Sequence, residues 1–247
     1  MEKDLVMGDC QLMIGDCLER MKEIGDKSID MILCDLPYGT TACKWDTIIP
    51  FEPLWEQYER VIKDNGAIVL TASQPFTSAL VMSNVKMFKY CWYWIKTRPT
   101  GFVNSKRQPM RNVEDIVVFY NKGNYIPQGL VRIDKIRKNS KSTGGDSIRG
   151  NTINSIGKGS LRTPGKEFIT EFTNYPRQTL EYSADNDKLH PTQKPVALFE
   201  YLIKTYTNDG ETVLDNTMGS GSTGIACINT NRKFIGIELD EKYYDIS

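Results

Sequence analysis

Short apolar runs alternate with segments of helical spacing in the first third of the chain. Residues 29–34 and 67–71 are largely apolar, which is typical of strands buried on both faces. Residues 51–62 and 74–82 have the length and spacing of helices, and Asn65-Gly66 is expected to break the first of them. This alternation of strand and helix predicts a parallel sheet covered by helices on both faces.

The same alternation returns at both ends of the chain. Residues 5–16 predict two short strands, and a helix is expected at 17–24. Near the C-terminus, apolar positions between 196 and 206 recur at helical spacing. Strands are predicted at 212–215 and 233–239, with a glycine-rich loop and the start of a helix at 225–229 between them. The chain is therefore expected to be one α/β fold.

The middle of the chain differs from both ends. Residues 89–97 and 116–120 are aromatic-rich strands, but from about 122 to 188 the periodicity disappears and glycine, serine, asparagine and basic residues dominate. More than 60 residues of weak structure are too many for a simple connector, so a functional insertion is predicted. A disordered linker is the alternative, although Phe168, Phe172, Tyr175 and Tyr182 offer anchors for folding.

Composition is that of an ordinary globular protein. The chain has 247 residues, of which 40% are hydrophobic and 25% charged, which suits one large domain with an insertion. No run approaches the roughly 18 apolar residues of a membrane span, and the first residues lack a signal-peptide pattern. The six cysteines form no C-x-x-C pair and there is one histidine, so no metal site is expected, and free thiols suit a reducing cytosol.

Charge is distributed unevenly although the net charge is zero. Residues 86–177 contain ten lysines and eight arginines against six acids, which gives this segment +12 and the remainder −12. Such a basic segment predicts a phosphate-binding surface. The alternative is a solvated lysine-rich face without a partner.

The stretch Asp35-Leu36-Pro37-Tyr38 follows the strand predicted at 29–34. Open α/β sheets bind their ligands at the carboxyl ends of strands, where Asp35 is expected. A carboxylate, backbone carbonyls, a rigid proline and an aromatic ring together suit a planar substrate that carries an amino group. From these residues alone, an ordinary Pro-Gly turn explains the pattern equally well.

A second candidate site follows the strand predicted at 212–215. Gly219-x-Gly221-x-x-Gly224 lies between a strand and a helix, and Glu238 ends the next strand, as in dinucleotide-binding loops. Ile225-Ala226 excludes a P-loop, which needs lysine followed by serine or threonine there. The loop indicates an adenosine cofactor smaller than a nicotinamide dinucleotide, and an oxidoreductase is a distant alternative. A serine hydrolase is strongly disfavoured because no G-x-S-x-G is present and His190, the one histidine, precedes a proline.

Three motifs together resemble a known family. Asp35-Leu36-Pro37-Tyr38 is similar to the D-P-P-Y motif of DNA amino-methyltransferases, and Asp215 to Thr223 is similar to their D-P-F-x-G-S-G-T-T cofactor loop. His190-Pro-Thr-Gln-Lys-Pro195 matches the segment before the cofactor helix. The order of the motifs resembles that of the circularly permuted beta group.

The resemblance implies a Rossmann-like methyltransferase fold, with a mostly parallel twisted sheet, helices on both faces and a basic irregular insertion. Residues 1–121 are expected to form the catalytic half and 189–247 the cofactor half of one domain, with a target-recognition insertion at 122–188.

Residue roles follow from the same resemblance. Asp35 and the Leu36 carbonyl are expected to hold the amino group of a flipped base, with Pro37 shaping the loop and Tyr38 stacking on the base. The residues expected at S-adenosylmethionine are Asp16, Thr192, Lys194, Asp215, Gly219, Ser220, Gly221, Ser222 and Glu238. The cations expected at DNA are Lys106, Arg107, Arg111, Arg132, Lys135, Arg137, Lys138 and Arg149. Leu36 and Asn216-Thr217 depart from the family pattern, and the second departure removes an aromatic from the cofactor pocket.

The implied activity is transfer of a methyl group from S-adenosylmethionine to adenine N6 in double-stranded DNA, since aspartate most often begins the motif of adenine enzymes. Cytosine N4 is the runner-up, and a catalytically silent DNA-binding module is an alternative of another class. Cytosine C5 chemistry is disfavoured because no Pro-Cys occurs. The resemblance further implies a cytoplasmic protein of prokaryotic or phage origin without membrane partners, and it leaves a homodimer and a cognate restriction enzyme open.

Overall fold

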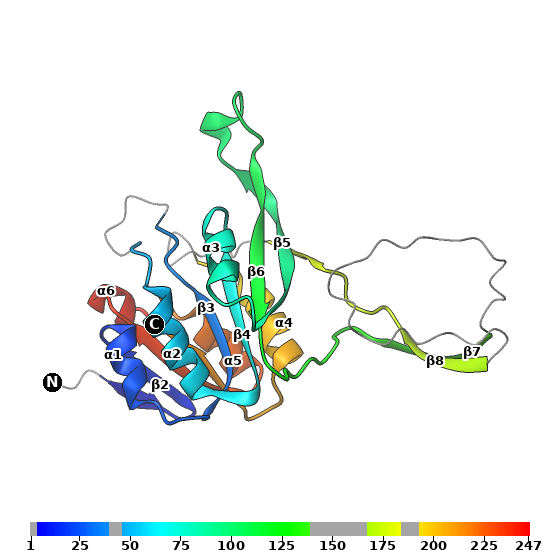
Figure 1. Ribbon diagram of the computed structural model, residues 1–247, viewed down its shortest axis with the longest axis horizontal. Coiled ribbons are helices and arrows are strands. Elements are labelled where there is room, and N and C mark those ends of the chain that lie inside the picture. Colours follow the sequence, from blue (N-terminus) through cyan, green and yellow to red (C-terminus); the bar gives the residue numbers. More distant parts are fainter. Residues whose placement is uncertain (1–3, 40–45, 139–166, 184–192) are drawn as a thin grey trace. The chain divides into compact units, whose positions relative to one another are not determined.

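The computed structural model describes residues 4–39, 46–138, 167–183 and 193–247 (Figure 1). They form two compact units, one comprising Met1–Ile126 with Arg177–Ser247 and the other Pro127–Pro176. Within the described residues, no helix has the length and apolar character needed to cross a bilayer.

The described part of the first unit is built on a nine-stranded sheet with the strand order β1-β2-β11-β10-β3-β4-β6-β5-β9. Its strands are β1 (Leu5–Met7), β2 (Cys10–Ile14), β3 (Ile29–Asp35), β4 (Ile62–Ala72), β5 (Phe88–Thr100), β6 (Arg111–Phe119), β9 (Thr179–Tyr182), β10 (Thr212–Asp215) and β11 (Lys233–Glu238). The five neighbours from β2 to β4 are parallel, whereas β1 and β6 run antiparallel to the strands beside them. The sheet is therefore mostly parallel, as the sequence predicts.

Strand β3 shows why the central strands are apolar on both faces. Ile32 and Cys34 join one buried cluster, whereas Met31 and Leu33 join another, and all four side chains are fully buried. The first cluster is covered by α1 (Cys17–Arg20), the short helix η1 (Met21–Glu23), α2 (Phe51–Val61) and α3 (Phe76–Ser83). The second is covered by α4 (Val196–Tyr206), α5 (Ser222–Asn229) and α6 (Glu241–Tyr244). The α/β class with helices on both faces is confirmed.

The predicted end of helix α2 differs from the structure. Helix α2 ends at Val61 and β4 begins at Ile62, so Asn65-Gly66 lies inside a strand and does not end the helix. Glycine is needed there because a Cβ at Gly66 would lie 2.7 Å from the carbonyl oxygen of Asp30 on β3. The close approach accompanies a shift in the β3–β4 register between Ile29 and Met31.

Regular structure also occurs in the segment 122–188, where the sequence shows no periodicity. Strand β9 pairs with β5 and belongs to the first unit. The second unit contains an antiparallel pair formed by β7 (Val131–Lys138) and β8 (Glu167–Thr173). Near the open end of this pair, the Asn174 side chain donates a hydrogen bond to the carbonyl oxygen of Gly129 at 2.7 Å.

Candidate active site

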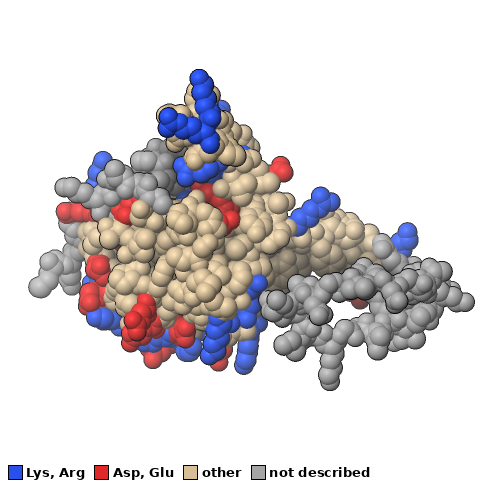
Figure 2. Space-filling view, turned by 45° about the horizontal axis from the view of Figure 1, so that its top comes forward, with Lys and Arg blue, Asp and Glu red and all other residues tan. Residues whose placement is uncertain are grey.

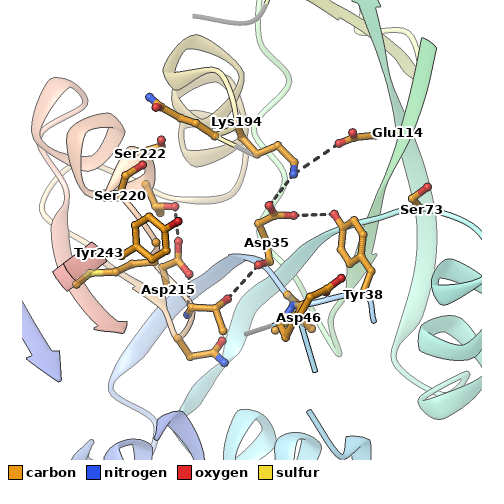
Figure 3. Close-up of a pocket in the computed structure, with 18 of the residues that line it drawn as sticks. Asp35, Tyr38, Asp46, Ser73, Glu114, Lys194, Asp215, Ser220, Ser222 and Tyr243 are labelled. Carbon is orange, nitrogen blue, oxygen red and sulfur yellow. Dashed lines mark hydrogen bonds and ion pairs between the residues drawn. The ribbon is translucent and has the colours of Figure 1, made fainter. Parts of the chain in front are cut away.

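Strands β3 and β10 are parallel neighbours from which the chain proceeds in opposite directions across the sheet. From β10 the next strand is β11 on one side, and from β3 it is β4 on the other. Ligands of open α/β sheets bind at such a switch point, beyond the carboxyl ends of the strands. Asp35 ends β3 and Asp215 ends β10, and both line a cavity of about 1070 Å³ (Figure 3). The topology therefore brings the two predicted halves of the site together.

Asp35 is an acceptor held by donors on three sides. Its Oδ1 accepts hydrogen bonds from the Tyr38 hydroxyl at 2.6 Å and from the Thr71 hydroxyl. Its Oδ2 accepts from the Lys194 ammonium at 2.6 Å. The Asp35 side chain remains 24% exposed, so one part of the carboxylate is open to the cavity. These contacts fix its orientation.

Tyr38 is anchored at both its ring and its hydroxyl. The ring stacks on Phe76 with centroids 5.2 Å apart and an angle of 27°. Burial, followed by the nearby Asp35 carboxylate, raises the pKa of the Tyr38 hydroxyl well above its usual value, so the hydroxyl stays a neutral donor. The loop then closes at Gly39, whose N–H donates to the Asp46 carboxylate at 2.8 Å.

Leu36 is the first departure from the family motif, and the packing of its side chain explains how the motif accommodates it. Its side chain is only 4% exposed and joins the buried cluster beneath the loop, while the residue lines the cavity together with Pro37. Apolar packing of this side chain is compatible with the predicted role of Leu36, which needs only the backbone carbonyl.

A buried ion-pair network adds two residues to the Asp35 site. The Lys194 ammonium lies 2.6 Å from Asp35 Oδ2 and 3.7 Å from Glu114 Oε2, and Lys96 pairs with the other Glu114 oxygen. Burial lowers the pKa of Lys194, but the two carboxylates more than offset this, so its pKa is raised and the ammonium stays charged. The sequence reasoning missed Glu114, whose only signal was an acid at the end of an acid-free basic stretch.

On the neighbouring strand, Asp215 is 2% exposed and organises the glycine-rich loop. Its Oδ1 accepts from the Thr217 N–H at 3.1 Å, and its Oδ2 accepts from the Thr223 hydroxyl at 2.5 Å. Burial raises the pKa of Asp215 from 3.8 to about 7, although these hydrogen bonds oppose the shift. The Thr217 hydroxyl also donates to the Asp35 carbonyl oxygen at 3.2 Å, which ties the two halves of the site.

The glycine-rich loop leaves open space at Gly219, shortly before α5. Gly219 has φ 55°, and nothing lies within 4 Å of where its Cβ would be. Gly221, with φ 80°, precedes α5 and supplies no side-chain cap, so the first N–H groups of the helix have no capping side chain. Ser220 and Ser222 are both 7% exposed and line the cavity.

Two further predicted cofactor residues border the loop. Glu238 accepts from the Gly219 N–H at 2.8 Å and from the Asp240 N–H at 2.8 Å, and burial raises its pKa. Asp16 lines the same cavity and caps α1 by accepting from the Leu18 N–H at 2.9 Å. The N–H of Gly15 donates to the Glu238 carbonyl oxygen at 2.8 Å, which holds the Asp16 turn beside the end of β11.

Asn216 accounts for one part of the second departure, the replacement of the motif's proline. It is 1% exposed, and its Oδ1 accepts hydrogen bonds from the Tyr58 hydroxyl at 2.6 Å and from the Cys34 thiol at 2.8 Å. A polar contact to α2 thus stabilises the loop at a position where the family pattern has proline. Asn216 also lines the cavity.

The predicted DNA-contacting cations fall on two elements. Lys106, Arg107 and Arg111 are exposed at the end of the β5–β6 hairpin in the first unit. Arg132, Lys135, Arg137 and Lys138 lie on β7 in the second unit, where Arg132 pairs with Asp134 at 2.7 Å. Thr192 and Arg149 lie outside the described residues.

The chain matches the model of one protein family and is similar to several known proteins. A family model described as DNA methylase, of the N6 and N4 type, matches residues 29–247. The chain is similar to the Type II methyltransferase M.HpaI of Haemophilus parainfluenzae, with 26% identity covering 97% of this chain and 73% of that protein. It is also similar to the DNA adenine methyltransferase YhdJ of Escherichia coli strain K12, with 29% identity covering 93% of this chain and 78% of that protein.

Solved structures show the same fold. The M1.HpyAVI complex with SAM aligns with a TM-score of 0.63 and 24% identity, covering 96% of this chain and 97% of that one. The cytosine-N4-specific PvuII DNA methyltransferase aligns with a TM-score of 0.67 and 15% identity, covering 98% of this chain and 86% of that one. The match to the family model extends over the whole of both motif loops.

Proposed function

The chain belongs to the family of N6 and N4 DNA methylases, and on this premise we propose that it methylates the N6 amino group of a flipped adenine in double-stranded DNA. The observation that carries the proposal is the oriented Asp35 carboxylate, which lies across one cavity from the glycine-rich loop. A silent binding module of the same fold would not need this arrangement.

S-adenosylmethionine is the cofactor of this family, and the described residues fit it. Open space at Gly219 admits a ligand close to the backbone, and the uncapped start of α5 suits a carboxylate. Glu238 and Asp16 provide acceptors beside the loop for ribose hydroxyls and an adenine amine, as the family motifs imply. When bound, the cofactor supplies a methyl group that is already activated on a sulfonium.

Asp35 then has one task in this reaction. The exocyclic amine of adenine is a weak nucleophile while its lone pair is conjugated with the ring. Hydrogen bonds from that amine to Asp35 and to the Leu36 carbonyl favour a localised lone pair and stabilise the positive charge that develops on nitrogen. Because Tyr38, Thr71 and Lys194 hold Asp35, the acceptor is oriented before the base arrives.

The base must leave the duplex to reach this cavity, and extrusion costs unstacking energy. We assign Tyr38 to stack on the flipped base, with Phe76 supporting its ring from one face. The cations of the β5–β6 hairpin and of the second unit are assigned to the phosphates of the duplex. The β7–β8 unit lies within the insertion that we assign to target recognition.

Adenine is favoured over cytosine on two grounds. The motif begins with aspartate, and a relative that covers 93% of this chain is named a DNA adenine methyltransferase. The cytosine-N4 neighbour, at 15% identity, supports the fold alone.

Relatives named Type II methyltransferases also support a cytoplasmic protein with a cognate restriction enzyme. We further propose that the protein forms a homodimer.

Nucleoside analysis tests the proposal. The protein is incubated with methyl-labelled S-adenosylmethionine and unmethylated bacterial genomic DNA, and the digested nucleosides are separated by mass. Label in N6-methyladenine is expected, whereas label only in N4-methylcytosine would move the assignment to the runner-up. Absence of label in DNA under all conditions would contradict the enzymatic proposal.

A further inference from the structure

The turn that joins β5 to β6 exposes two large apolar side chains. Phe102 and Val103 lie next to each other in the short helix η2 (Phe102–Asn104), and they are 76% and 95% exposed. Single exposed apolar residues are common on protein surfaces, but an adjacent pair at the end of a projecting hairpin is a frequent sign of an interaction site. Figure 1 shows this hairpin extending beyond the rest of the sheet.

The part of the same hairpin that leads into this turn forms part of the active-site wall. Thr97 to Thr100 on β5 and Arg111 and Val113 on β6 line the cavity that contains Asp35. The two strands pair up to Ile95 and Val113, and after a shift in register they pair again at Thr100 and Arg111, where the turn begins. A ligand that covers the mouth of this cavity therefore lies next to the hairpin.

The charge of the hairpin identifies the kind of ligand. From Arg98 to Val113 the chain contains no acidic residue, and four exposed cations, Arg98, Lys106, Arg107 and Arg111, flank the apolar pair. Figure 2 shows lysine and arginine side chains gathered on this projection. An apolar tip surrounded by cations is complementary to DNA, whose phosphates surround stacked bases.

The tip is held in shape by its own backbone. Asn104 N–H donates to the Gly101 carbonyl oxygen at 3.0 Å, and Ser105 N–H donates to the Phe102 carbonyl oxygen at 3.0 Å. Arg107 N–H closes the next turn on Asn104 at 2.9 Å. Gly101 has φ 89°, a conformation that allows the strand to enter this turn without strain. A tip organised in this way loses little conformational entropy on binding.

We propose that Phe102 and Val103 form a wedge that enters the base stack of duplex DNA and occupies the space left by the extruded adenine. The proposal rests on the methyltransferase function proposed above and assigns this chain's base-extrusion step to the β5–β6 tip. The cations at the tip hold the neighbouring phosphates, while the apolar pair replaces the stacking that the departing base gives up.

The test compares two duplexes that carry the recognition sequence, which is first determined by methylation-sensitive sequencing. In one duplex the target adenine is paired with thymine, and in the other it faces an abasic site and is already easy to extrude. Single-turnover methyl transfer is measured at saturating S-adenosylmethionine for the wild type and for the double variant Phe102→Ala/Val103→Ala. For the paired duplex we expect the variant to lose about tenfold or more in rate, and for the abasic duplex less than about threefold.

Met82→Ala is the matched control, since Met82 is 73% exposed on α3 and lies outside the hairpin. It should behave as the wild type on both duplexes. Equal loss by the double variant on both duplexes, or no loss on either, would overturn the wedge while wild-type transfer still supports the proposed function. If the wild type transfers no methyl group to either duplex, both proposals fail together.

Discussion

Asp35 accepts from three side-chain donors before any substrate is present, and this arrangement defines its chemistry. A carboxylate that is paired with the Lys194 ammonium is a well-oriented acceptor. Glu114 lies on the other side of Lys194 and balances its charge, so the positive charge that develops on the amine is not opposed by an isolated cation. We therefore interpret Asp35 as a residue that orients and stabilises the amine.

The raised pKa of Asp215 predicts how the free energy of unfolding depends on pH. Its pKa in the folded protein is about 7 because of burial, against an ordinary value of 3.8. Between these values the native state holds a proton that the unfolded chain has lost, so the free energy cost of burying Asp215 grows as the pH rises from about 4 to 7. Asp215→Asn removes this cost. Its free energy of unfolding relative to the wild type should rise by up to about 1.4 kcal/mol per pH unit.

Urea denaturation of both proteins at pH 5, 6 and 7 measures this difference. The comparison at each pH cancels the titration of all other groups that are unaffected by the substitution. A difference that stays constant over this range would show that Asp215 has no raised pKa in the folded protein.

At the scale of elements, helix α2 supports the cofactor loop through one buried contact. The Tyr58 hydroxyl donates to Asn216 Oδ1 at 2.6 Å, and Tyr58 is fully buried. The second donor to this oxygen is the Cys34 thiol, which is a weak one. The glycine-rich loop therefore depends on a helix that lies more than 150 residues earlier in the chain.

Tyr58→Phe should destabilise the protein by about 1 kcal/mol, because the buried Asn216 carbonyl loses its stronger donor. Chemical denaturation measures the change, and Tyr175→Phe is the control because Tyr175 is 60% exposed. If the two variants were equally stable, the contact between α2 and the loop would make no contribution.

The elements also show where sequence reasoning succeeds and why it stops. Helix α4 and strand β10 have the predicted boundaries, because apolar spacing and turn residues define them locally. Strand β9 was missed because its four residues show no apolar run, and it becomes a strand by pairing with β5. The early start of β4 likewise depends on a close approach to β3 that no local pattern reveals.

At the scale of the whole molecule, the sheet assembles one site from segments about 180 residues apart in sequence. The motifs and their order predicted both halves, Asp35 to Tyr38 and Asp215 to Glu238, and the strand order β10-β3 makes them neighbours. The contact between Lys194 and Asp35 could not be predicted, since it joins residues 159 positions apart through side-chain geometry alone. The match to the DNA methylase family spans residues 29–247 and so includes both segments.

The most direct test of the account separates the two halves of the site with Asp35→Asn. This substitution keeps the size of the side chain but removes its charge, and it leaves Glu114 to pair with Lys194. We predict that single-turnover methyl transfer to duplex DNA falls by about 10²-fold or more, while the dissociation constant for S-adenosylmethionine changes by less than about threefold. Transfer at the wild-type rate, or loss of cofactor binding together with transfer, would contradict the account.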